Sequence, residues 1–170
     1  MILISFKGGT KKQQDLTEDA ARYFVKKLLP RKRNLRIDFH IRNILKENAA
    51  GYCSMLDSAN DFLIELHHRG TLYDYVSYLA HEMVHLKQYT NKEMNEAGMW
   101  KGVDHSKTAY SKQPWEREAW AAQHNLAKDF IKNELGFTLK DAKNISPRTM
   151  KAINWDLEIK YLEDICNAQS

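Results

Sequence analysis

Cysteine, proline and glycine are all scarce in this sequence of 170 residues, which contains 2, 3 and 7 of them. The two cysteines, Cys53 and Cys166, lie far apart without a metal-ligand spacing, which argues against a disulfide-stapled secreted scaffold. No apolar run approaches the ~20 residues that span a bilayer, and the opening MILISF is too short for the apolar core of a signal peptide. We therefore expect a cytoplasmic protein without a membrane anchor.

A general excess of one charge is also missing, except near the N-terminus. The net charge is +4, whereas residues 1–50 contain 12 Lys or Arg against 5 Asp or Glu. The basic cluster Arg31-Lys32-Arg33 with Arg36 fits phosphates or an acidic partner, but a solvated turn between a helix and a strand is the simpler interpretation. The composition, 43% hydrophobic and 28% charged, fits a single domain over residues 1–170 with a sizeable core.

Strands and one helix are expected in the first seventy residues. Apolar alternation and short apolar runs predict four strands of a small mixed or antiparallel sheet, over residues 2–6, 35–41, 51–56 and 61–66. The last two flank a turn-forming Asp-Ser-Ala-Asn stretch, which favours an antiparallel pair. Asp15 and Glu18 match a capping box, which predicts a helix over 16–29.

Helices dominate the rest of the predicted structure, over residues 72–89, 114–135 and about 148–165. Thr71 and Asp74 form a second capping signature for the first of these. Pro114 suits the opening position of the next helix, and the polar segment 90–113 before it reads as a long loop. The predicted fold class is α+β, with a helix and a small sheet before the later helices.

The stretch HEMVH, residues 81–85, lies inside the predicted helix 72–89. Residues four apart on a helix differ by ~40° and one turn, so the imidazoles of His81 and His85 can converge on one ion. Glu82 can lean over the open coordination position and accept a proton from a bound water, whose pKa a zinc ion lowers toward ~7. A chance match on a surface helix is the alternative, but the surrounding helix signals favour a catalytic metal site.

A catalytic zinc site needs a third protein ligand. The stretch PWEREAW, at the start of the predicted helix 114–135, offers two candidates, Glu116 and Glu118. Carboxylates near a helix start also complement the helix dipole without binding a metal. The upstream HEMVH favours the ligand role for one of the two.

The two motifs together resemble the small gluzincin-type metallopeptidases, in which an HExxH helix is completed by a glutamate from a later helix. They are similar in particular to minimal metallopeptidases of phage and bacterial genomes that pair HExxHxxQ[YW] with PWExEA, and the stretches here are HEMVHLKQY and PWEREAW. The resemblance covers about residues 60–125. It implies a zincin-like fold, zinc-dependent cleavage of a protein or peptide substrate, and the host cytoplasm as the location if the chain is phage-encoded.

The resemblance also bears on the choice of the third ligand. In gluzincins this ligand is commonly the first Glu of an ExxA[DN] pattern, which corresponds to Glu116 here, with Ala119 in place. Glu118 remains the alternative ligand. Trp120 stands where the family usually has an Asp or Asn that supports the site, so the support must differ.

Other residues near the motifs have two interpretations each. Gluzincins often stabilise the oxyanion with a Tyr or His, so Tyr110 and His105 are candidates for that role, or else ordinary loop residues. Segment 61–66 resembles the zincin edge strand that pairs with extended substrate, or is simply a sheet edge. The remaining histidines are expected to be structural or exposed: His40, His67, His68 and His124.

Two rival functions stay open beside zinc-dependent peptide-bond hydrolysis. Peptide deformylases combine an HExxH helix with a cysteine ligand from an upstream strand, but GYCS around Cys53 does not match their EGCLS, and a buried structural cysteine is the simpler interpretation. SprT-like metalloproteases act on DNA-bound proteins, and the basic N-terminal third therefore keeps open a nucleic-acid-associated protease or an inactive binding module. No zinc ribbon is recognisable in support of this second rival.

Overall fold

Parallel pairing at the centre of the sheet determines its strand order. The computed structural model describes residues 1–43 and 49–148, and its main sheet has the order β1-β2-β4-β3. The strands are β1 (Ile2–Gly8), β2 (Leu35–Arg42), β3 (Gly51–Met55) and β4 (Asp61–His67). The pairs β1–β2 and β2–β4 are parallel, and β3–β4 is antiparallel. The sheet is therefore mixed, and an antiparallel arrangement holds only for the β3–β4 hairpin.

The edge strand of the sheet on the side of the HEMVH motif is β3 rather than β4. Leu63 of β4 pairs with Asp38 of β2 on one side and with Ser54 of β3 on the other. The prediction that segment 61–66 is an edge strand is therefore wrong. Segment 61–66 is an inner strand because one of its sides hydrogen-bonds to β2 and the other to β3.

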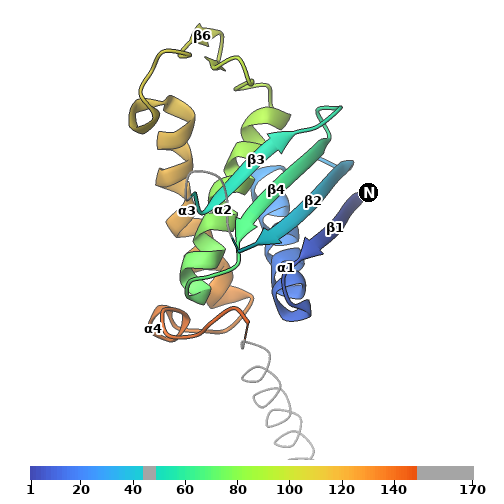
Figure 1. Ribbon diagram of the computed structural model, residues 1–170, viewed down its shortest axis with the longest axis vertical. Coiled ribbons are helices and arrows are strands. Elements are labelled where there is room, and N and C mark those ends of the chain that lie inside the picture. Colours follow the sequence, from blue (N-terminus) through green and yellow to red (C-terminus); the bar gives the residue numbers. More distant parts are fainter. Residues whose placement is uncertain (44–48, 149–170) are drawn as a thin grey trace, which may run out of the picture.

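The helices cover one face of the sheet. Helix α1 (Lys11–Leu28) and helix α2 (Leu72–Thr90) lie behind it, and α3 (Pro114–Asn133) packs against α2 (Figure 1). Strand β2 turns its apolar side chains toward these helices, where Leu35, Ile37, Phe39 and Ile41 are buried. The predicted α+β class is thus confirmed, with helices following the sheet.

Helix α2 is the central element of the packing. Thirteen of its 19 residues are buried, because the sheet lies on one side and α3 on the other. Its N-terminus carries the predicted capping box, in which Thr71 and Asp74 bond each other's backbone N–H groups. A buried hydrogen bond of 2.7 Å joins Tyr75 of α2 to Thr17 of α1. The Thr17 hydroxyl already donates to the Gln13 carbonyl, so Tyr75 is the donor.

Some expected boundaries differ from the observed ones. Helix α1 begins at Lys11, since Thr10 and Gln13 form its capping box, and the box predicted at Asp15 is wrong. The predicted loop 90–113 contains the strands β5 (Met99–Trp100) and β6 (Val103–Asp104) and a 3-10 turn, Tyr110–Lys112. A short helix α4 (Leu139–Ala142) follows α3. The helix predicted over about 148–165 lies outside the described residues, apart from its first position.

The basic cluster lies in the turn that joins α1 to β2. Arg31, Lys32 and Arg33 lie between the end of α1 and the start of β2, where Arg31 and Arg33 are exposed. This placement agrees with the solvated-turn interpretation.

Over residues 1–43 and 49–148, no helix combines the length and apolar character that a membrane crossing requires.

The two possible caps of α1 can be told apart by their effect on stability. Replacing Thr10 by Ala removes the side chain that accepts from the Gln13 backbone N–H, and should lower the free energy of unfolding by about 1 kcal/mol. Asp15→Ala is the matched control, because its exposed ion pair with Lys11 contributes little. Urea unfolding of both variants measures the difference. An Asp15→Ala loss as large as that of Thr10→Ala would contradict the observed cap.

Candidate metal centre

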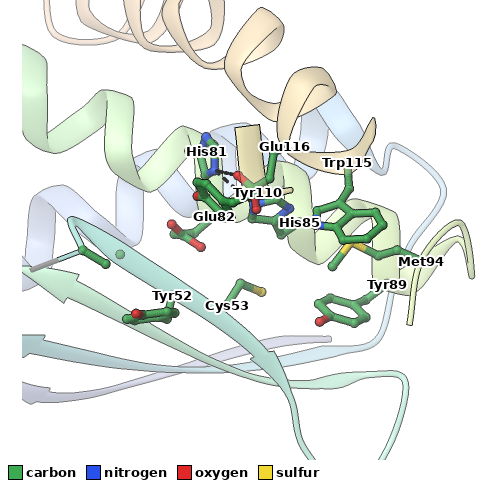
Figure 2. A pocket seen from close by; sticks show the side chains of 12 residues that line it. Tyr52, Cys53, His81, Glu82, His85, Tyr89, Met94, Tyr110, Trp115 and Glu116 are labelled. Carbon is green, nitrogen blue, oxygen red and sulfur yellow. Dashed lines mark hydrogen bonds and ion pairs between the residues drawn. The ribbon is translucent and has the colours of Figure 1, made fainter. Parts of the chain in front are cut away.

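The two histidines of α2 direct their Nε2 atoms into the same space (Figure 2). His81 and His85 lie one helical turn apart, and their Nε2 atoms are separated by 3.0 Å. The rings stand almost perpendicular, at 83°, with centroids 4.7 Å apart. Two ring nitrogens this close cannot both carry protons without a clash. The arrangement suits nitrogen lone pairs that are directed at one ion.

A third side chain reaches this space from the first turn of α3. Pro114 opens that helix, and Glu116 two residues later faces α2. Its carboxylate oxygens lie 3.1 Å from His81 Nε2 and 3.4 Å from His85 Nε2. The three side chains are buried, and one ligand atom from each lies within 4.8 Å of the other two. This buried His-His-Glu group can hold a metal ion.

The charge of Glu116 is favoured by its neighbours. Burial by itself raises the pKa of this carboxyl group, but its close contacts with His81, His85 and Tyr110 outweigh burial and lower the pKa to about 2. Glu116 is therefore ionised at neutral pH. A carboxylate in that state is a suitable partner for a dication.

The carboxamide of Gln88 orients the His85 ring. Its Oε1 lies 2.8 Å from His85 Nδ1, while its Nε2 donates to the Trp115 carbonyl at 3.0 Å and to Glu118 at 2.6 Å. Those two partners can only accept, so the amide group has one possible orientation, and its oxygen must accept from Nδ1–H. The His85 proton is thereby held on Nδ1, which leaves Nε2 free to bind a metal.

Glu118 faces a different set of partners from Glu116. It accepts from Gln88 and from the Lys87 ammonium, whose Nζ lies 3.3 Å from Glu118 and 2.7 Å from Glu93. Burial raises the pKa of Glu118, but Gln88 and Lys87 outweigh it and hold the pKa below the usual range. Of the two carboxylates proposed as third ligand, the structure brings only Glu116 to the histidines.

Gln123 supports the His81 ring, a role that Trp120 cannot take in place of the Asp or Asn usual at its position. Its Oε1 lies 2.8 Å from Nδ1 of His81, which is the same contact that Gln88 makes with His85. Trp120 instead packs its ring 6.4 Å from the His81 ring, at a tilt. Each imidazole therefore has a carboxamide oxygen on its Nδ1 side.

Glu82 lies on the open side of the group, close to the edge strand. It is only 5% exposed and lines a cavity of about 430 Å³ together with His81, His85 and Glu116 (Figure 2). Burial raises the pKa of Glu82 to about 8, against the effect of His81 and with that of Glu116. Gly51 of β3 leaves room for this carboxylate, because a Cβ at that position would stand 2.7 Å from Glu82 Oε1.

The two predicted oxyanion stabilisers lie in different places. Tyr110 lines the same cavity as Glu82 and Glu116, and its hydroxyl is near enough to Glu116 to lower the pKa of that carboxyl group. His105 lines a neighbouring cavity, where its Nδ1 lies 3.2 Å from the Thr108 hydroxyl. Its ring packs edge-on against Trp115 at 6.3 Å. The structure therefore brings Tyr110, and not His105, to the three possible ligands His81, His85 and Glu116, called the metal group below.

Cys53 and the other described histidines stand outside the metal group. Cys53 is a half-buried residue of β3 that lines the same cavity, and burial of its thiol, followed by the charge of Glu82, raises its pKa well above the usual value. A deformylase-type cysteine ligand is thus not part of the described cluster. The remaining histidines make contacts elsewhere: His40 with Arg42, His67 with His68, His68 with Asn43 and His124 with Tyr73.

Sequence reasoning missed the two glutamines and the glycine. Gln88 follows His85 by three residues and Gln123 follows Glu116 by seven, so each shares a helix face with a proposed ligand. That spacing was a usable signal. Gly51 lies thirty residues before the motif, and only the folded backbone reveals its contact with Glu82.

Comparisons with known proteins yield no relative. No protein-family model matches the chain, and searches of the curated proteins and of the solved structures found no match. The chemistry of the site must therefore be inferred from its own residues.

The choice between the two candidate ligands predicts a clear difference in metal content. Glu116→Ala should lose stoichiometric metal, because it removes the only carboxylate at the two Nε2 atoms among the described residues. Glu118→Ala should still purify with metal. Elemental analysis of both variants beside the wild type measures this. Metal loss confined to Glu118→Ala would contradict the assignment, and a wild type that binds no metal would refute the centre itself.

The two glutamines should tune metal affinity without being ligands. Gln88→Ala and Gln123→Ala each remove the acceptor of an Nδ1–H group, and should weaken metal binding about 10- to 100-fold. Asn125→Ala, which changes an exposed amide on α3, is the control. Competition with a chromogenic chelator for Zn²⁺ gives the affinities. Wild-type affinity in both glutamine variants would show that the rings are oriented by something else.

Proposed function

We propose that this protein is a zinc-dependent hydrolase of peptide bonds. The observation that supports the proposal most strongly is the convergence of two imidazole Nε2 atoms and one carboxylate beside the buried Glu82, at the wall of a cavity. Two histidines and a glutamate are a frequent ligand set of catalytic zinc, which keeps a further position open. The resemblance of HEMVHLKQY and PWEREAW to gluzincins points the same way.

The residues present fit zinc in particular. Neutral imidazoles and a carboxylate are ordinary zinc donors, and four-coordinate zinc accepts three of them with one open position. Gln88 holds the proton of His85 on Nδ1, and Gln123 does the same for His81, so both Nε2 atoms are available. The ionised Glu116 supplies the negative charge that a buried dication requires.

Glu82 carries the proton transfers in this proposal. Zinc, when bound, lowers the pKa of water and polarises a carbonyl group. Glu82 takes the proton from the attacking water and later gives it to the nitrogen of the departing amine. Burial raises the pKa of Glu82 to about 8 in the absence of a metal, and a dication at the neighbouring ligands would lower this pKa, so that Glu82 is ionised and can accept the proton.

Tyr110 and β3 complete the proposed reaction site. The Tyr110 hydroxyl, which shares the cavity with Glu116 and lowers its pKa, can donate a hydrogen bond to a developing oxyanion. One side of β3 pairs with β4, and within the described chain no strand pairs with its other side. An extended peptide can add to that edge and so pass over the cavity.

Replacing Glu82 by Gln should separate catalysis from metal binding. The variant keeps the size of the side chain but cannot accept the proton, so we expect full metal content and a loss of activity of about 100-fold or more. Cleavage of a casein or quenched-peptide substrate by zinc-loaded protein is the measurement. Glu96→Gln, an exposed carboxylate on the loop after α2, serves as control. Unchanged turnover in Glu82→Gln would rule out the assigned base.

A further inference from the structure

The cavity continues past the metal group on the side of His85. There its lining consists of Cys53, Tyr89, Met94 and Trp115 (Figure 2). The histidines and carboxylates that also line the cavity all belong to the reaction site already described: His81, Glu82, His85 and Glu116. Burial raises the pKa of Tyr89 to about 12, so its hydroxyl stays neutral. This end of the cavity is therefore uncharged.

The walls of this end are held by packing from several elements. Trp115, in the first turn of α3, lies 6.4 Å from the Trp100 ring and edge-on to His105. Met94 makes a backbone bridge to Trp100. Tyr89, in the last turn of α2, packs 6.4 Å from Phe62 of the core. The uncharged end is thus shaped before any ligand enters.

Two of these wall residues also border neighbouring cavities. Tyr89 and Met94 also line two neighbouring cavities, one of them bounded by Met55 of β3 and Met99 of β5. Three neighbouring cavities that share the walls Tyr89 and Met94 therefore lie between the metal group and the β5–β6 hairpin. A chain that pairs with β3 would present one of its side chains to Met94 and Trp115.

We propose that Tyr89, Met94 and Trp115 form a specificity subsite that takes a large apolar side chain next to the scissile bond. The proposal rests on the function proposed above, and it narrows the substrate to peptides with a residue such as leucine, methionine or phenylalanine at that position. Burying such a side chain removes apolar surface from water without leaving a charge unpaired. Met94 adapts to different apolar shapes because its side chain is unbranched and flexible.

Binding of peptide hydroxamates tests this subsite without requiring turnover. Two series place a varied side chain on either side of the metal-binding hydroxamate group, and calorimetry on the zinc-loaded protein measures each affinity. In one series the leucyl and phenylalanyl compounds should bind about 10-fold or more tightly than the glycyl and aspartyl compounds. Equal affinities across both series, or no binding at all, would overturn the subsite.

A negative charge introduced at Met94 should reverse the ligand preference, and a misfolded variant would not produce such a reversal. Met94→Glu should weaken the leucyl hydroxamate about 10-fold and make the lysyl compound the better of the two. Val103→Glu places the same charge on the exposed part of the neighbouring hairpin, outside the described cavities, and should leave the preference unchanged. A leucyl preference that persists in Met94→Glu would also overturn the proposal.

The hydroxamate and cleavage results distinguish the two levels of the proposal. If the apolar hydroxamates are preferred but zinc-loaded protein cleaves no peptide, the subsite stands and the hydrolase function fails. If peptides are cleaved while neither hydroxamate series discriminates, hydrolysis stands and the subsite fails.

Discussion

Two imidazoles can share one ion only if each presents a bare nitrogen, and the packing of α2 against α3 meets this condition. Gln88 and Gln123 accept the Nδ1 protons of His85 and His81, which leaves both Nε2 atoms without a proton. Gln88 can do this in one orientation only, because its own N–H groups are used by Glu118 and a backbone carbonyl. The metal group thus depends on amide groups that never touch the ion.

The two buried carboxylates of the site have opposite environments. Burial raises the pKa of Glu116, but its contacts with both histidines and Tyr110 outweigh burial and lower the pKa to about 2. Glu82 lines the same cavity, and burial raises its pKa to about 8. Paired acids whose pKa values are driven apart divide the tasks of a reaction between them. The division suits a charged ligand on one side and a proton carrier on the other.

The sequence predicts local structure here better than it predicts contacts between elements. Helix spacing and the Thr71 cap were sufficient to place His81 and His85 on one face of α2. Glu116 and Glu118 are separated by only two positions, about 200° around the helix, so the packing of α3 decides which one faces inward. The edge position expected for segment 61–66 failed for a similar reason, because the parallel pairing of β2 with β4 joins strands that are not consecutive in the chain.

Gly51 extends the site beyond its side chains. Because a Cβ there would collide with the Glu82 side chain, this side chain must pack directly on the backbone of β3. The pattern that defines this centre is therefore longer than HExxH: it begins with a glycine on an edge strand and includes one glutamine on each of two helices. Related chains are better sought with that dispersed pattern than with the five-residue motif, which many unrelated proteins contain by chance.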